Sequence, residues 1–187
     1  MRTFLIVLLL TQNLFSCAAD VTARQNSWAQ PVTGTSLSNF YQVAPQIYRS
    51  EQPDSKSFKE LEAFGIKSVL SLRDHHKDDE EGAKETSLIL YQVETSASSI
   101  SVDNVIAALR IIRDSPKPIL IHCRHGADRT GCICAMYRVV FQNWSKEDAI
   151  DEMENGGFGF HGWMFKNIPE LIRSADIEVI KKAMEKP

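Results

Sequence analysis

The sequence is poor in cysteine and in long apolar segments. Four cysteines occur among 187 residues, and three of them (Cys123, Cys132 and Cys134) lie within one short stretch. Cysteines placed in this way do not form a disulfide framework, so the fold has to depend on a hydrophobic core, for which the chain is long enough. The apolar run from Phe4 to Leu10 is far too short to span a bilayer as a helix.

Basic residues are not in excess either. The chain has 21 Lys and Arg against 24 Asp and Glu, which gives a formal net charge of -3. This balance excludes a polybasic surface for nucleic acid or membrane headgroups. Any binding of anions therefore has to come from a few local residues. The sequence also lacks internal repeats and paired metal-ligand motifs, so neither a metal nor a cofactor is expected.

The N-terminus has the pattern of an export signal. Basic Met1-Arg2 precedes the apolar run, which predicts a signal peptide over residues 1–16. Leu14-Phe-Ser-Cys17 resembles a bacterial lipobox, so lipidation of Cys17 and ordinary signal cleavage near it are both open. We expect an exported protein, either in the periplasm or cell envelope or secreted. Polar, aperiodic residues 17–38 predict a tether, followed by one domain over residues 39–187.

Apolar periodicity in the remaining chain alternates between strands and helices. Strands are expected at 40–43, 46–50, 66–72, 88–93 and 119–121, and helices at about 55–64, 101–112, 132–141, 145–154, 163–174 and 176–185. This alternation predicts an α/β fold with a central, mainly parallel sheet flanked by helices. The charged stretch from Asp74 to Glu85 is expected to be a solvated surface.

The most informative stretch runs from Ile119 to Gly131. Apolar residues lead into His122 and Cys123, five residues follow before Arg129, and an apolar helical run comes next. This order predicts a buried strand, a tight loop and a helix that begins where the loop ends, an arrangement that turns backbone N–H groups toward an anion. The cysteine there is expected to be a thiolate, with its pKa lowered from about 8.5 to roughly 3.5–7.5. The arginine can hold two oxygens of a phosphate. Together these features predict phosphoryl transfer through cysteine.

The motif His122-Cys123-x5-Arg129-Thr130-Gly131 resembles the signature of the cysteine-based protein tyrosine and dual-specificity phosphatases. Tyr48–Pro53 and Ile66–Arg73 are similar to the N-terminal half of bacterial dual-specificity-like phosphatases, so the resemblance covers roughly residues 40–175. It implies a protein-tyrosine-phosphatase-like fold and hydrolysis of phosphate monoesters without a metal.

The resemblance also implies roles for the loop residues. Cys123 would attack phosphorus, Arg129 would bind the phosphate and stabilise the transition state, and Thr130 would donate a hydrogen bond to the departing sulfur. His122 would orient the cysteine from behind the loop. Further substrate-binding residues are expected at Arg124, His125, Gly126, Ala127 and Gly131.

The general acid departs from the usual family pattern. The upstream segment in which the family carries an aspartate holds only Glu94 here. Asp128 lies inside the loop, as in myotubularin-like lipid phosphatases, and is the favoured acid, with a raised pKa expected. Glu94 and Asp74 are the alternatives, and a further one is that no acid is essential, which would suffice for aryl phosphates with good leaving groups. Asp128 could instead pair with Arg129 or Arg124.

The predicted substrate is phosphotyrosine, with phosphoserine and phosphothreonine as further candidates. Two basic loop residues, Arg124 and His125, would equally suit a phosphoinositide or inositol phosphate, unless they point to solvent. A phosphate-binding pseudoenzyme is the third reading. Aromatic residues of segment 156–163 either line the pocket or pack in the core. A regulatory disulfide from Cys132 or Cys134 to Cys123 is a further open question.

Overall fold

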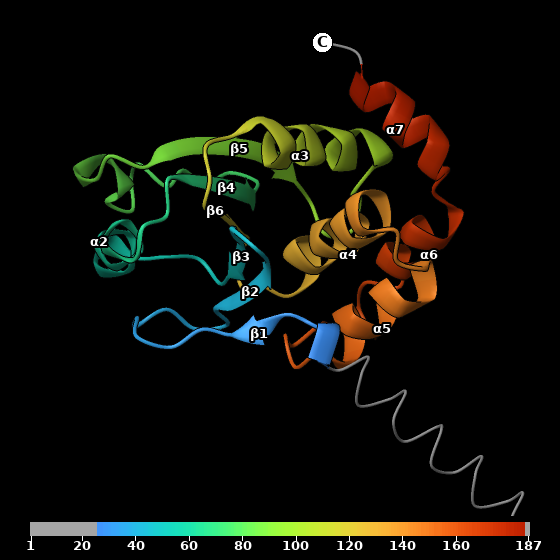
Figure 1. Cartoon of the computed structure of the whole chain (residues 1–187), viewed down its shortest axis with the longest axis horizontal. Helices are drawn as coiled ribbons and strands as arrows, with labels where there is room; N and C mark the ends of the chain where they lie inside the picture. The colour runs from blue at the N-terminus through green and yellow to red at the C-terminus, as the bar shows by residue number, and fades with distance from the viewer. Residues whose placement is uncertain (1–25, 186–187) are drawn as a thin grey trace, which may run out of the picture.

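A six-stranded sheet forms the centre of the computed structural model, which describes residues 26–185 (Figure 1). The strands are β1 (Gln30–Pro31), β2 (Tyr41–Ala44), β3 (Ile47–Ser50), β4 (Ser68–Arg73), β5 (Ile89–Thr95) and β6 (Ile119–His122). The helices are α2 (Ser55–Phe64), α3 (Val102–Asp114), α4 (Asp128–Gln142), α5 (Lys146–Asn155), α6 (Asn167–Ser174) and α7 (Ile177–Glu185), with a short 3-10 turn at Ala83–Glu85.

The strand order is β1-β2-β3-β6-β4-β5. The pairs β3–β6, β6–β4 and β4–β5 are parallel, whereas β1–β2 and β2–β3 are antiparallel. The predicted α/β fold with a mainly parallel central sheet is confirmed. Its central strand is β6, which leads directly into the cysteine loop.

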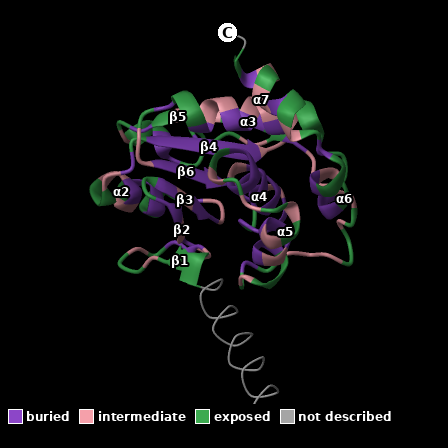
Figure 2. Ribbon diagram, turned by 45° about the vertical axis from the view of Figure 1, so that its right-hand side comes forward, coloured by how far each residue is buried: buried purple, intermediate pink, exposed green. Residues whose placement is uncertain are grey.

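Helices cover both faces of the sheet, and the buried strands lie between them (Figure 2). Side chains alternate between the faces along each strand: Leu120 packs with α2, whereas Ile119 and Ile121 pack with the helices on the opposite face. The larger of the two cores lies between the sheet and helices α3 to α7. This burial on both faces explains the continuous apolar run of β6.

Local capping signals place the helix ends as expected. Asp54 accepts a hydrogen bond from the backbone N–H of Ser57 at the start of α2, and Gly65 ends that helix at a φ of 104°. Ser101 forms a capping box with Asn104 at the start of α3. These interactions are short-range, which is why the sequence alone predicted them.

The N-terminal boundary of the domain needs a correction. The sequence predicts a tether over residues 17–38, but Gln30–Pro31 pairs with β2, and Ala29 and Leu37 are buried. The backbone N–H of Ala29 also donates to the carboxylate of Glu152 (2.6 Å). The folded part thus begins before residue 39. The predicted signal peptide and Cys17 lie outside the described residues.

Two other expectations also change. The charged stretch 74–85 is not entirely a solvated surface, because Asp78 is buried against the sheet. Residues 162–164 form a turn, and α6 begins only at Asn167. Within residues 26–185, no helix combines the length and the apolar character needed to cross a bilayer.

Candidate active site

The cysteine loop lies at the carboxyl end of the central strand. β6 is flanked on both sides by parallel strands and ends at His122, and α4 begins at Asp128. Carboxyl ends of parallel strands are the usual position of ligand sites in α/β sheets. Cys123 is buried at the start of the loop, while Arg124 and His125 are exposed.

Three successive carbonyl groups of the loop are held from outside. The backbone N–H of Gln52 donates to Arg124 (3.2 Å), Nδ2 of Asn39 donates to His125 (2.8 Å), and Nη2 of Arg49 donates to Gly126 (2.6 Å). Because a peptide carbonyl and the N–H of the next residue point in opposite directions, these bonds turn the following N–H groups to the other side. In the described part of the chain, no N–H of residues 124–130 has a hydrogen-bond acceptor. The loop is therefore built as an anion cradle.

Arg49 is a site residue that sequence reasoning missed. Its side chain is among the largest fully buried ones, and its guanidinium lies over the ring of Phe158 at 3.8 Å. Phe158 itself is buried, so it packs in the core and does not line the pocket. Arg49 thereby adds a fixed positive charge behind the loop.

Gly126 is required by the close approach of the loop to β3. Its φ is +68°, and an added Cβ would lie 2.4 Å from the carbonyl oxygen of Ser50. The next residue, Ala127, is buried, and its carbonyl accepts the N–H of Gly131 (2.8 Å). At Gly131 a Cβ would lie 2.9 Å from the side chain of Met153, so this glycine allows α4 to pack closely on α5.

Arg129 is held at the ends of two strands. Its Nη1 donates to Oδ1 of Asp74 (2.8 Å), just after β4, and to the carbonyl of Thr95 (2.9 Å), at the end of β5. The side chain is largely buried, whereas that of Asp74 is partly exposed. The structure therefore places Asp74 in an ion pair with the predicted phosphate-binding arginine. Glu94, the other alternative acid, is exposed on β5.

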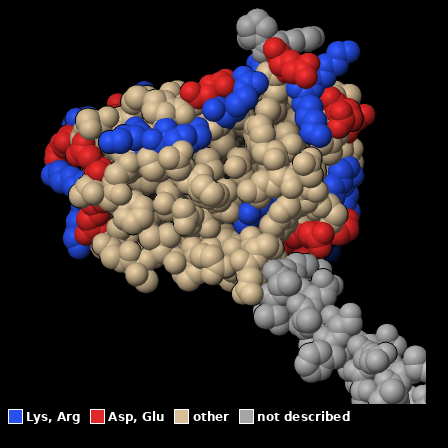
Figure 3. All heavy atoms as spheres, viewed as in Figure 1, with Lys and Arg blue, Asp and Glu red and all other residues tan. Residues whose placement is uncertain are grey.

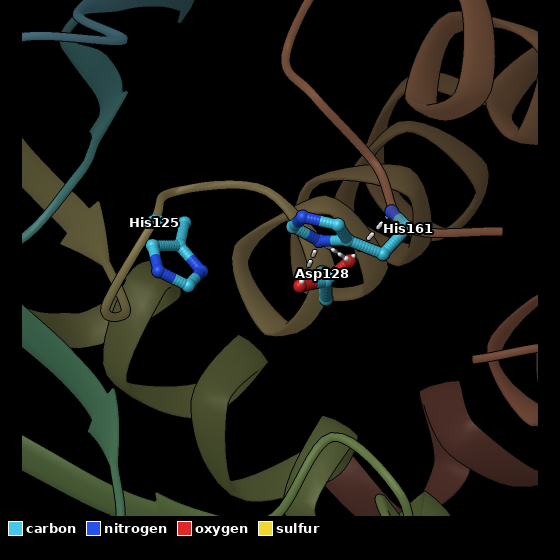
Figure 4. A group of neighbouring side chains, drawn as sticks. All are labelled: His125, Asp128 and His161. Carbon is cyan, nitrogen blue, oxygen red and sulfur yellow. Dashed lines mark hydrogen bonds and ion pairs between the residues drawn. The ribbon is translucent and has the colours of Figure 1, made fainter. Parts of the chain in front are cut away.

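Asp128 has a partner that sequence reasoning did not foresee. Its carboxylate is buried, and Oδ1 accepts the backbone N–H of His161 (2.9 Å). The Nδ1 atom of His161 lies 3.1 Å from Oδ1 and 3.0 Å from Oδ2 (Figure 4). The predicted site residue is thus tied to the glycine-rich segment 156–162 and not to Arg129 or Arg124. No pattern in the sequence marks a pair 33 residues apart.

Thr130 is fully buried in the first turn of α4. Within residues 26–185 its hydroxyl has no hydrogen-bond partner, so the expected donation to the sulfur of Cys123 is not formed in this structure and stays a prediction. Cys132 and Cys134 fill core space, as expected. Burial raises the pKa of their thiols to about 12 and about 11, so both are protonated at neutral pH. All three cysteines of the described part are free.

His122 is anchored from behind the loop. Its Nε2 atom lies 2.8 Å from Oδ2 of Asp78, and both side chains are buried. Burial by itself would raise the pKa of Asp78, but the hydrogen bond and charge of His122, with Gln52 and His76, outweigh it and lower that pKa. The segment expected to be a solvated surface therefore supplies the residue that fixes the orientation of the histidine before Cys123.

Three arginines gather near the loop. Burial and repulsion by Arg129 and Arg124 lower the pKa of Arg73. Arg73 also donates to the side chain of Gln52 (3.2 Å). Since the chain as a whole is acidic, this cluster is a local concentration of positive charge, as required for binding an anion.

Comparisons with known proteins agree with this geometry. A family model described as "Tyrosine phosphatase family" matches residues 35–161. The chain is 34% identical over 171 residues to "Dual specificity protein phosphatase TpbA" of Pseudomonas aeruginosa, covering 89% of this chain and 76% of that protein. A crystal structure of TpbA superposes with a TM-score of 0.74 at 33% identity, over 86% of this chain and 98% of that one.

A second group of relatives is named for a different activity. "Inositol diphosphatase SIW14" of Saccharomyces cerevisiae is 33% identical over 129 residues, covering 64% of this chain and 46% of that protein. The structure of its catalytic core superposes with a TM-score of 0.68 at 31% identity, over 84% of this chain and 95% of that chain.

Proposed function

Because the chain belongs to the tyrosine phosphatase family, we propose that it hydrolyses phosphate monoesters, phosphotyrosine foremost, through a phosphocysteine intermediate at Cys123. It is a cysteine-dependent, dual-specificity-like phosphatase. The observation that carries this assignment is the loop itself: three of its carbonyls are held from outside, and no N–H of residues 124–130 has an acceptor among residues 26–185. TpbA, the relative named above, has been crystallised in complex with phosphotyrosine.

The chemistry that this arrangement supports has two steps. The Cys123 thiolate attacks phosphorus, an S–P bond forms, and the P–O bond to the leaving group breaks. Water then attacks the phosphocysteine, which releases phosphate and the thiolate. The loop N–H groups and Arg129 would stabilise the charge on the equatorial oxygens in both transition states. Thr130, whose buried hydroxyl has no partner in the part of the chain that the structure describes, would donate to the departing sulfur in the second step.

The leaving oxygen needs a proton in the first step. Asp128 remains the proposed source, acting as a pair with His161, because its carboxylate shares hydrogen bonds with the imidazole at 3.0–3.1 Å. Asp74 is less suited to this role, since it is in an ion pair with Arg129.

The decisive test is hydrolysis of an aryl phosphate by wild type and by Cys123→Ser. We expect kcat to fall at least about a thousandfold, because serine lacks a comparable thiolate. The matched control is Cys132→Ala, which removes a buried thiol nearby and should retain activity within about threefold. Equal activity of wild type and Cys123→Ser would refute the mechanism, whereas inactive wild-type protein would favour a phosphate-binding pseudoenzyme.

A second candidate substrate class is inositol phosphates or phosphoinositides. The observation in its favour is the cluster of Arg73, Arg124 and Arg129, whose mutual repulsion suits several phosphate groups on one ligand. Relatives named inositol diphosphatases add support. A panel of phosphopeptides and inositol phosphates separates the two classes. If Arg124→Ala lowers kcat/KM for inositol phosphates much more than for phosphotyrosine peptides, inositol phosphates are supported as substrates. If the enzyme hydrolyses no inositol compound, this substrate class is excluded.

We also propose that the chain is exported, on the basis of the N-terminal pattern in residues 1–16. Lipidation at Cys17 remains the finer alternative to simple cleavage. Expression of the full chain in a bacterium, followed by detergent partitioning, tests both. If Cys17 is lipidated, the wild-type protein should partition into the detergent phase and the Cys17→Ala variant should stay in the aqueous phase. An uncleaved chain that stays in the cytoplasm would contradict export.

A further inference from the structure

Beside the cysteine loop, two imidazoles and one carboxylate converge. One ligand atom each of His125, Asp128 and His161 lies within 4.8 Å of the other two. Figure 4 shows the imidazole of His161 over the carboxylate of Asp128, with His125 on the neighbouring part of the loop. The two rings have a centroid separation of 5.8 Å. From this convergence we propose that these residues form a binding site for a divalent transition-metal ion of the zinc type, and that the bound ion inhibits the phosphatase.

The spacing is close to that of a metal site. In tetrahedral coordination with bonds of about 2.0–2.1 Å, adjacent ligand atoms are roughly 3.4 Å apart. The distance of 3.0 Å between Nδ1 of His161 and Oδ2 of Asp128 is already short enough for both atoms to reach one ion. Only His125 has to approach further. Its side chain is exposed, so rotation of the ring is not opposed by core packing.

The backbone around the three side chains is preorganised. Nδ2 of Asn39 donates to the carbonyl of His125 (2.8 Å) and to that of Phe158 (3.0 Å), which ties the cysteine loop to the segment that carries His161. The N–H of His161 also fixes Oδ1 of Asp128 at 2.9 Å, which leaves Oδ2 as the ligand atom. Such outer hydrogen bonds orient ligands and strengthen metal binding. Asp128 and His161, which are distant in sequence, are therefore held in place before an ion binds.

The ligand set selects the type of ion. Two neutral imidazoles with one carboxylate suit Zn²⁺ and related ions, whereas Mg²⁺ and Ca²⁺ prefer oxygen ligands alone. The nearby arginines disfavour cations, so binding has to come from these ligand bonds and not from the overall field. Binding displaces any proton shared by His161 and Asp128, so metal affinity should fall as the pH decreases.

Inhibition follows from the position of the site and rests on the proposed function. His125 and Asp128 lie in the loop between Cys123 and Arg129, so an ion bound to them sits beside the reaction site. The bound ion also prevents the Asp128–His161 pair from transferring a proton. The bound ion also restricts the movement of the exposed side of the loop. Zn²⁺ should therefore lower kcat, most strongly for substrates with poor leaving groups, which depend on the acid.

Two measurements test the proposal separately from the phosphatase assignment. Binding of Co²⁺ is followed by its visible absorption in Cys123→Ser, which lacks the loop thiol, and Zn²⁺ is titrated in competition. We expect Co²⁺ binding without a thiolate charge-transfer band, and at least about 30-fold weaker binding in His161→Gln. The matched control is His75→Gln, an exposed histidine of another loop, which should bind as tightly as its parent.

The second measurement is inhibition of wild-type aryl phosphatase activity by Zn²⁺. The inhibition constant should rise with the loss of binding in His161→Gln and stay unchanged in His75→Gln. Circular dichroism checks the fold of each variant, and His125→Gln replaces His161→Gln if the latter does not fold. Loss of Co²⁺ binding in Cys123→Ser, or unchanged binding in both site variants, overturns the metal site. An inactive wild type that still binds Co²⁺ would overturn the phosphatase assignment and its inhibition but leave the site.

Discussion

At the scale of single residues, the catalytic loop combines a motif that is local with supports that are not. Cys123, Arg129 and Thr130 follow one another within eight positions, so the sequence displays them together. Their function depends on Arg49, Asn39 and the backbone of Gln52, which hold the loop carbonyls. Residue-scale predictions therefore concern both groups.

Asp128→Asn tests the proton donor. We expect loss of the basic limb of the pH–rate profile, because the amide cannot supply a proton. The decrease in kcat should be small for a nitrophenyl ester and on the order of a hundredfold for an alkyl phosphate, whose leaving group needs protonation. The control is Glu94→Gln. A profile that changes in Glu94→Gln and not in Asp128→Asn would move the role to the upstream segment.

Gly126→Ala tests the cradle. The added Cβ would meet the carbonyl of Ser50 at 2.4 Å in a left-handed conformation, so the loop has to shift away from β3. We expect at least a hundredfold loss of kcat/KM, roughly the effect of misplacing a reacting group by about 1 Å. Gly34→Ala is the control, because Gly34 also has a positive φ (+96°) but nothing within 4 Å of the added atom. Comparable activity in both variants would argue against a tightly fitted loop.

Asp78→Asn tests, through the pH dependence of stability, how much the Asp78 carboxylate behind His122 contributes. The pKa of Asp78 is lowered in the folded state, so its contribution to stability is complete above the ordinary pKa of 3.8 and is lost as the pH falls below that value. We expect a loss of about 1–2 kcal/mol at pH 7, since a charge-assisted hydrogen bond is weakened. Urea unfolding at pH 7 and near pH 3 measures both values. A difference that does not shrink in acid would contradict this origin.

At the scale of elements, α4 carries the loop and is fixed by its neighbours. Arg138 on α4 forms a buried, two-bonded pair with Glu152 on α5 (2.6 and 2.8 Å), and its guanidinium lies 4.3 Å from the ring centre of Trp144. Glu152 also accepts the N–H of Ala29, which joins the N-terminal strand to the same cluster. The position of the catalytic helix thus depends on a charged cluster that no local pattern reveals.

Glu152→Gln should destabilise the protein strongly. One charge of a buried pair would be left without its partner, at a cost of about 3–5 kcal/mol. Glu147→Gln is the matched control, because Glu147 forms a similar two-bonded pair with Arg173 that is exposed. Its substitution should cost far less stability, because water and salt screen an exposed ion pair. Chemical unfolding of both variants measures the difference, and equal losses would show that burial does not decide the value of these pairs.

At the scale of the whole molecule, the charge distribution is mixed. Figure 3 shows basic and acidic side chains interspersed around a largely uncharged central area of the face in view. The positive charge that matters is the small cluster around Arg129, in a chain whose formal net charge is -3. Substrate selection therefore depends on the site and not on a general surface field.

Truncation tests the extent of the domain. A chain that starts at residue 26 should keep the stability of the domain, whereas one that starts at residue 39 loses β1, buried Leu37 and the bond from Ala29 to Glu152. We expect a loss of about 3–5 kcal/mol and a fall in Tm of roughly 10 °C, from the lost apolar burial and the unpaired carboxylate. Identical melting curves would restore the boundary at residue 39.

The sequence by itself determined those features of this protein that depend on neighbouring residues. The strand, loop and helix at 119–142, the caps at Asp54, Gly65 and Ser101, and the family signature all depend on neighbours within a few positions, so the sequence displays them. Tertiary structure alone decided that Gln30–Pro31 joins the sheet, that Asp78 holds His122, that Arg49 and Asn39 hold the loop, and that His161 faces Asp128. The contacts of Asp78, Arg49, Asn39 and His161 join residues far apart in the chain, and they form only because folding brings the ends of several strands and loops to one edge of the sheet. Gln30–Pro31 pairs with the nearby β2, but a strand of two residues has no periodicity for the sequence to display.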